Sequence, residues 1–483
     1  MKNAFIVLTL MLFALSAVAV EGELPFSHED AGIEVLMPDT VLFASEVAMG
    51  KYWEPSTDIF GDGTILIMGG AYPEGMTEGM NAKVAFIGTD GTVSEFWAFY
   101  NDAGEPYTGE FNEARKDGNP PRVAADRRPG GTLYVTGEES TPFLYEGFDS
   151  DGRWEQELFF YGANQIAAVQ AFEKTADGPQ PLTNVIDPVY GSGTIEGEQN
   201  NQMRFGGDIR ILSNGNILVV VEDRNQGVFV GGNAAIATIF DSQTAEIVKG
   251  PFNAAGDDTS HSIWSNVVAF KDGFAVRTEE IMSIYDDDGN LQHGGVIAQE
   301  DWTTVTDTGR GDGTRIAASI EGNIVYIIGK NADGDMVISG FNAATGVADK
   351  EIVINEEELW LFGTFDRGEM AVDNNGNVCV AYVFQDQSLM AEQQIAARIF
   401  DSNLEPVTPT FFAFTQFERW DTPDVQGIMS KEVNVSMDTQ RIVIAADGVT
   451  LDASGELTPA EHTFAVVLKN PFAATSIDGW ELH

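Results

Sequence analysis

The stretch Asp208-Ile-Arg-Ile-Leu212, the glycine Gly215 and the run Ile217-Leu-Val-Val-Val221 follow one another closely in the chain. A polar residue leads a short, mostly apolar run, a turn with glycine follows, and a second apolar run rich in β-branched residues completes the stretch. Two short runs on either side of a glycine turn, without helical spacing, predict a pair of antiparallel β-strands.

This pattern occurs seven times along the chain. Two further examples are Ser56-Thr-Asp-Ile-Phe60, followed by Gly63, and Arg315-Ile-Ala-Ala-Ser319, followed by Gly322. Each copy begins with a polar residue, and these are Ser56, Arg122, Asp208, Asn266, Arg315, Glu369 and Glu432.

A second hairpin follows each copy, for example Ile395–Ser402 with Pro406–Val407. Two hairpins give four antiparallel strands, named a to d. One such unit cannot bury both of its faces, whereas units stacked radially can, so the repeat predicts an all-β fold, a seven-bladed β-propeller. The last copy offers no fourth strand after Thr463–Val467, and we expect Thr40–Ala44 to close the ring as that strand.

The first 19 residues have the pattern of a secretory signal peptide. Lys2 precedes an apolar run, and small residues end it at Ala17-Val-Ala19. The run is shorter than the roughly 20 residues that span a bilayer. We therefore expect residues 1–19 to be a signal peptide, residues 20–483 to be a single β-propeller domain, and the protein to be secreted, either extracellular or periplasmic, without a membrane span. Cys379 is the only cysteine, so no intrachain disulfide is expected.

The chain carries 26 basic and 75 acidic residues, which gives a formal net charge of −49. Nucleic acids and anionic membranes require a basic surface, so neither is expected as a partner. A saline habitat explains this excess as well as a functional role does.

The repeats resemble the secreted bacterial propellers related to the sialidase superfamily. The Asp-box motif of that superfamily occupies the turn between strands c and d. Ser150-Asp-Gly-Arg-Trp154 is similar to this motif, although one residue shorter, and we assign it to such a turn. The resemblance implies the propeller architecture but no sialidase active site, because the arginine triad and the Tyr/Glu pair cannot be assigned here.

The long connections all belong to one end of the predicted ring. They join strand d to the next strand a, as in Gly162–Gly207, or strand b to strand c, as in Gly69–Asn81. Elaborated loops on a rigid scaffold often carry function. Five tryptophans lie in the d–a connections and either stack on a ligand or wedge between blades; they are Trp53, Trp264, Trp302, Trp360 and Trp420.

The polar residues that begin the strands a should surround one mouth of the central channel. Arg122 and Arg315 begin two similar copies, in blades that face each other across it. Such arginines can hold the anion of a ligand. Alternatively, they pair with acidic residues of the channel and hold blades together. The candidate ligand-binding residues are Arg122, Arg315, Arg210, Asp208, Asn266, Glu369, Glu432, Trp53, Trp264 and His261.

Few patterns of known chemistry are present. The five histidines form no metal-binding pair, so no metal site and no cofactor are expected. The acidic turns Asp286–Asn290 and Asp333–Asp335 allow weak Ca²⁺ binding, but they lack the ligand spacing of an EF-hand. His261, next to Trp264 on the elaborated end, is the histidine best placed for acid–base work.

Three functions remain open, because propellers host all of them. We expect a monomeric binding module, not an enzyme, that recognises a glycan, peptide or protein partner on the face of the d–a and b–c loops. The alternatives are a carbohydrate-active enzyme, either a glycosidase or a polysaccharide lyase with its site at the channel mouth, and an extracellular structural scaffold.

The charge generates a first prediction. With a net charge of −49 the folded chain repels itself, and counterions screen this repulsion. The melting temperature should therefore fall when salt is removed and recover when salt or Ca²⁺ is added, as measured by circular dichroism. A melting temperature that is the same at low and high salt would contradict this.

Overall fold

The computed structural model describes residues 25–44, 55–71, 81–100, 104, 122–139, 167–184, 186, 203–223, 234–254, 266–277, 281–297, 315–330, 336–353, 368–385, 393–414, 433–451 and 457–473. These ranges contain 28 strands joined by turns. Within them, no helix is long and apolar enough to cross a membrane.

The strands form seven separate sheets of four antiparallel strands each. Blades 1 to 4 consist of β2 (Ser56–Ile59), β3 (Ile65–Ala71), β4 (Asn81–Ile87) and β5 (Val93–Trp97); β6 (Arg122–Ala125), β7 (Leu133–Glu139), β8 (Ala167–Thr175) and β9 (Gly178–Pro181); β10 (Met203–Ile211), β11 (Ile217–Asp223), β12 (Ala234–Phe240) and β13 (Ile247–Asn253); β14 (Asn266–Phe270), β15 (Gly273–Arg277), β16 (Ile281–Asp286) and β17 (Leu291–Ile297).

Blades 5 to 7 follow in chain order. They consist of β18 (Arg315–Ala318), β19 (Ile324–Lys330), β20 (Met336–Asn342) and β21 (Val347–Val353); β22 (Gly368–Val372), β23 (Val378–Gln385), β24 (Gln393–Phe400) and β25 (Phe411–Phe412); β26 (Val433–Met437), β27 (Arg441–Leu451), β28 (Leu457–Lys469) and β1 (Val35–Ala44).

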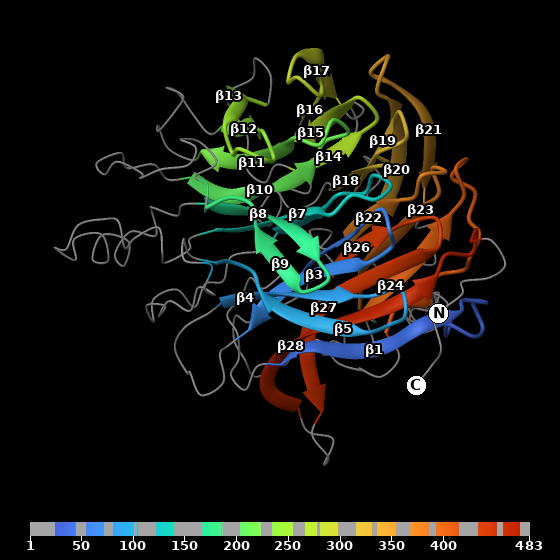
Figure 1. The fold of residues 1–483 in the computed structure, drawn as a ribbon. Helices are drawn as coiled ribbons and strands as arrows, with labels where there is room; N and C mark the ends of the chain where they lie inside the picture. Colours follow the sequence, from blue (N-terminus) through green and yellow to red (C-terminus); the bar gives the residue numbers. More distant parts are fainter. Residues whose placement is uncertain are drawn as a thin grey trace, which may run out of the picture.

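The first strand of each blade is strand a, and each strand a contacts the strand a of the next blade around the whole ring. Figure 1 shows β14, β18, β22 and β26 near the middle of the ring, with β13, β17 and β21 at its periphery. The prediction of a seven-bladed β-propeller is confirmed.

The N-terminal strand closes the ring as predicted. β1 pairs antiparallel with β28, with Thr40 opposite Ala465 and Ala44 opposite His462. The residues before β1 also reach blade 6, where Phe26 forms a parallel bridge with Phe411. The N-terminal part of the described chain therefore joins blade 7 to blade 6 as well as completing blade 7.

The hydrophobic core consists of seven clusters, each between two neighbouring blades. Strand β3 shows how one strand serves two of them. Ile65 and Ile67 pack against blade 7, and Leu66 and Met68 pack against blade 2. Both faces of the blade are buried, which explains why its sequence is an unbroken apolar run and not an alternating one.

Three details of the predicted strands and turns are wrong. Ser150–Trp154 lies between β7 and β8, in a b–c connection outside the described residues, and the c–d turn of blade 2 joins Thr175 to Gly178. The segment Gly162–Gly207 is not one connection, because it contains β8 and β9. Pro406–Val407 is not strand d of blade 6: Pro406 forms a single bridge to Phe400, and β25 is that strand.

Two buried tyrosines generate the second prediction. Tyr134 is fully buried and stacks on Phe172 with the ring centroids 4.9 Å apart, and among the described residues its hydroxyl has no hydrogen-bond partner. Tyr285 is also buried, but its hydroxyl donates to the carbonyl oxygen of Ala254 at 2.9 Å. Because an unpaired buried hydroxyl is unfavourable, Tyr134→Phe should leave the free energy of unfolding unchanged or raise it, whereas Tyr285→Phe should lower it by about 1 kcal/mol. Urea unfolding of the two variants measures this, and a larger loss in Tyr134→Phe would contradict it.

Candidate functional site

The central channel is lined by residues from strand a of every blade. We number the residues of each strand a from its polar leading residue, so that Ser56, Thr57 and Asp58 are positions one to three of blade 1. Side chains at positions one, three and five point toward the following blade, as Ser56 and Asp58 do toward blade 2. Those at positions two and four pack toward the preceding blade, as Ile59 does. The alternation follows from the pleat of a β-strand.

The lining differs between the two halves of the ring. Blades 1 to 3 contribute charged and hydroxyl side chains. Blades 4 to 6 contribute mostly small or aliphatic residues, with Asn266 and Glu369 at the leading positions. Position three shows the difference most clearly, since it holds Asp58, Ala124, Arg210, Val268, Ala317, Ala371 and Asn434 in blades 1 to 7.

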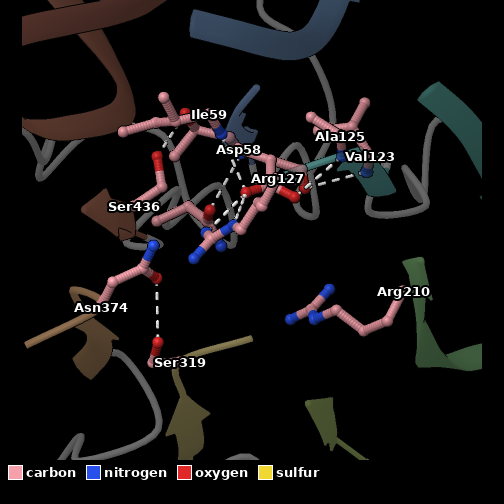
Figure 2. Close-up of polar contacts among 12 residues, drawn as sticks. Asp58, Ile59, Val123, Ala125, Arg127, Arg210, Ser319, Asn374 and Ser436 are labelled. Atoms are coloured by element: carbon pink, nitrogen blue, oxygen red, sulfur yellow. Dashed lines mark hydrogen bonds and ion pairs between the residues drawn. The ribbon is translucent and has the colours of Figure 1, made fainter. Parts of the chain in front are cut away.

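Asp58 is at the centre of the polar half. It is 6% exposed and pairs with Arg127, whose Nη2 lies 2.5 Å and whose Nε lies 2.6 Å from Asp58 Oδ1. The other carboxylate oxygen accepts the amide of Ala125 at 2.8 Å, and Oδ1 also accepts the amide of Ile59 at 2.8 Å. Figure 2 shows Arg127 folded against Asp58, so that blade 2 is fixed to blade 1 at the channel wall.

A second ion pair lies within strand β10. Arg210 binds Asp208 through both guanidinium Nη atoms, each at 2.6 Å, and Nη1 also donates to the carbonyl oxygen of Ile209. Residues two apart in a strand share a face, which is why these side chains meet. Of the two interpretations of the arginines, pairing with an acidic residue of the channel holds for Arg210. The pair joins no blades, because both residues belong to one strand.

Both arginines retain donors that face the channel. Their side chains are 27% and 29% exposed for Arg127 and Arg210, respectively, and both residues line the channel. Among the described residues, Nη1 of Arg127 and Nε of Arg210 have no hydrogen-bond partner. In Figure 2 the Arg210 side chain extends from its strand into the space that it shares with Arg127.

The lining is close to electrically neutral. Among the described residues, Arg122, Arg127 and Arg210 face Asp58, Asp208 and Glu369. The whole chain has a formal charge of −49, so an anion meets less repulsion here than the average surface would offer.

The structure brings together five of the predicted site residues. Arg122, Asp208, Arg210, Asn266 and Glu369 all line the channel, and Arg122 is 7% exposed. Arg315 begins β18, but its side chain is outside what the structure describes. The remaining candidates lie outside the described residues, and they are Glu432, Trp53, Trp264 and His261.

Three further residues line the channel but were not among the predicted site residues: Asp58, Arg127 and Asn434. Asn434 accepts the amide of Thr57 at 2.9 Å and so joins blade 7 to blade 1. A signal for two of them was present, because Asp58 and Asn434 are polar at position three, where four of the seven copies have alanine or valine. No such signal was available for Arg127, because it lies after the end of β6 and its side chain extends back to Asp58.

The part of the chain that the structure describes contains no group of three His, Cys, Asp or Glu residues that could hold a metal ion.

No known protein family matches the sequence, and no curated protein does. The fold is similar to solved propellers at low identity. Trypanosoma rangeli sialidase is 10% identical with a TM-score of 0.38, and the match covers 90% of this chain and 59% of that one. The NanB sialidase from Streptococcus pneumoniae is 11% identical with a TM-score of 0.41 (90% and 71% covered). The WD40 domain of Toxoplasma gondii coronin is 7% identical with a TM-score of 0.43 (93% and 88% covered).

The chain thus spans less than two thirds of the T. rangeli enzyme and resembles propellers of unlike description. Matches with sequence identities and TM-scores this low concern the architecture alone, and they say nothing about a ligand or a reaction.

The link between blades 1 and 2 generates the third prediction. Asp58→Ala leaves the charge of Arg127 and the amide of Ala125 without their partner, so it should lower the free energy of unfolding by about 3 kcal/mol. Ser56→Ala is the matched control, because Ser56 Oγ only accepts the amide of Val123, at 3.1 Å, between the same blades. It should cost about 1 kcal/mol. Equal losses in urea unfolding would show that the ion pair adds nothing to the amide contacts.

Proposed function

We propose that the protein is a secreted binding module that takes the anionic end of a ligand into its central channel. The observation that carries the proposal is the pair of partly exposed guanidinium groups, Arg127 and Arg210, in an otherwise very acidic chain. The donors that remain, Nη1 of Arg127 and Nε of Arg210, suit charge-assisted hydrogen bonds to a carboxylate or a similar oxyanion. The remainder of the ligand, a glycan, peptide or protein, would lie on the face from which the d–a and b–c connections emerge.

Binding fits Asp58 and Asp208 better than catalysis does. Asp58 accepts from Arg127, Ala125 and Ile59, and Asp208 accepts from both Nη atoms of Arg210. A general acid or base needs an oxygen that can reach the reacting group. These oxygens are occupied within the protein, so the two residues serve better to orient the arginines than to move protons.

The test uses acetate as the probe, followed by isothermal calorimetry at fixed ionic strength. Arg127→Met and Arg210→Met should each weaken acetate binding by about tenfold to a hundredfold, the usual effect of losing a charge-assisted hydrogen bond. Lys83→Ala is the control, because Lys83 pairs with Glu95 on the outer strands of blade 1, away from the channel, and its removal should leave the affinity unchanged.

A second measurement guards against unfolded variants. Acetate should raise the melting temperature of the wild type in proportion to its binding, and this rise should be smaller in folded Arg210→Met. An affinity that is equal in the wild type and both arginine variants would refute the channel as the anion site.

A further inference from the structure

The innermost strands present a free backbone edge to the channel. At position five the backbone amide points toward strand b. The amide of Asp126 donates to the carbonyl oxygen of Leu133 at 2.9 Å, and the amide of Leu212 donates to the carbonyl oxygen of Asn216 at 2.9 Å. In an antiparallel pair, alternate residues direct both N–H and C=O away from the partner strand. Position four therefore faces away from strand b, and strand a has no other neighbour in its sheet.

In blades 1 and 2 a side chain caps this edge. Asp58, at position three, accepts the position-four amides of Ile59 in its own blade and of Ala125 in the next. Asn434, at position three of blade 7, accepts the amide of Thr57, which is at position two of blade 1. A polar acceptor at position three is what supplies such a cap.

In blades 3 to 7 no described side chain caps the position-four edge. Position three of the preceding blade is alanine, valine or arginine, and none of these side chains accepts a hydrogen bond. Among the described residues outside the same sheet, none bonds these amides. All five residues line the channel and are at most 9% exposed, and they are Ile211, Ala269, Ala318, Val372 and Val435.

Buried peptide groups are almost always hydrogen-bonded, to protein, water or ligand, so the uncapped N–H and C=O groups of five adjacent blades can bind a ligand in exchange for water. The partner must both donate and accept, because each residue offers both groups. A hydroxyl group does both. Across the channel, Arg127 and Arg210 offer only donors, which suits a carboxylate.

The channel has room for a small organic ligand. Its cavity volume is about 80 Å³, several times the roughly 10–15 Å³ that one water needs. A short hydroxylated carboxylate therefore fits the channel.

We infer that the channel binds a small hydroxy carboxylate, with its carboxylate on Arg127 and Arg210 and its hydroxyls on the backbone edge of blades 3 to 7. This rests on the proposed function, since the carboxylate is the anion proposed there. A free hydroxy acid and the exposed end of a larger acidic ligand share this chemistry.

Calorimetry with propionate, lactate and glycerate tests the inference, because these anions share a three-carbon chain and carry zero, one and two hydroxyls. Each hydroxyl should tighten binding by about twofold to tenfold, the usual worth of a neutral hydrogen bond. Methyl glucuronide, in which the carboxylate and hydroxyls belong to a sugar ring, separates the two sources: it binds if the ligand is the end of a larger acidic molecule. Sulfate, which cannot donate, should bind more weakly than glycerate.

A variant can cap the edge without touching the arginines. Ala317 is at position three of blade 5, so Ala317→Asn should cap blade 6 at Val372 as Asp58 caps Ala125. It should reduce the gain from hydroxyls, because one of the five uncapped blades is then capped, while propionate, which has no hydroxyl, should bind as before. Ala317→Val adds bulk without an acceptor and is the matched control, in which the gain should persist. Melting temperatures show that both variants fold.

The outcomes separate the two proposals. If propionate binds through the arginines and hydroxyls add nothing, or if sulfate binds as tightly as glycerate, the hydroxy-acid inference is overturned and the anion site stands. If none of the anions binds, both fail.

Discussion

The apolar faces of each blade must be covered on both sides, and only another blade of the same kind can cover them. The seven interblade clusters satisfy this requirement around a closed ring. The ring leaves no blade with an exposed apolar face, which explains why blade 7 recruits β1 from the other end of the chain to complete its sheet. The same geometry brings seven strands a to the axis, where no further strand can pair with them. The channel and its free backbone edges are thus a consequence of how the core is buried.

That constraint gives position three of strand a an unusual importance. An acceptor there, such as Asp58 or Asn434, satisfies the backbone of the next blade and fixes the two blades together. An alanine, such as Ala317 or Ala371, leaves the backbone to be satisfied by something else. Capping would stabilise the ring, and natural sequences often give up such stability where a site is needed. The channel contains both solutions: blades 1 and 2 are capped, and blades 3 to 7 are not, although blade 3 carries the ion pair of Arg210 with Asp208.

The fold could be predicted because repeated, unbroken apolar runs and glycine turns depend on local sequence. Even the closure by Thr40–Ala44 followed from a missing strand. The errors arose where local signals fail. β9 reads Gly-Pro-Gln-Pro, which no propensity favours as a strand, yet proline is tolerated there because the strand is at the sheet edge. Because β9 was not predicted, Ser150–Trp154 was assigned to the wrong turn. The pairing of Asp58 with Arg127 was equally hidden, since residues 69 apart meet only once blades 1 and 2 are stacked.

The large excess of acidic residues is weak evidence about function, because many acidic side chains accept hydrogen bonds from backbone amides within turns. Asp241 accepts the amides of Thr244 and Gln243, and these bonds lower the pKa of its carboxyl group. Asp90 does the same with Thr92. A carboxylate that caps a turn is selected for its acceptor oxygens, whatever partner the protein has. The channel differs, because three of the chain's 26 basic residues converge there from blades 2 and 3, and two of them pair with Asp58 and Asp208. The proposed anion site rests on this departure from the overall charge, and not on the charge itself.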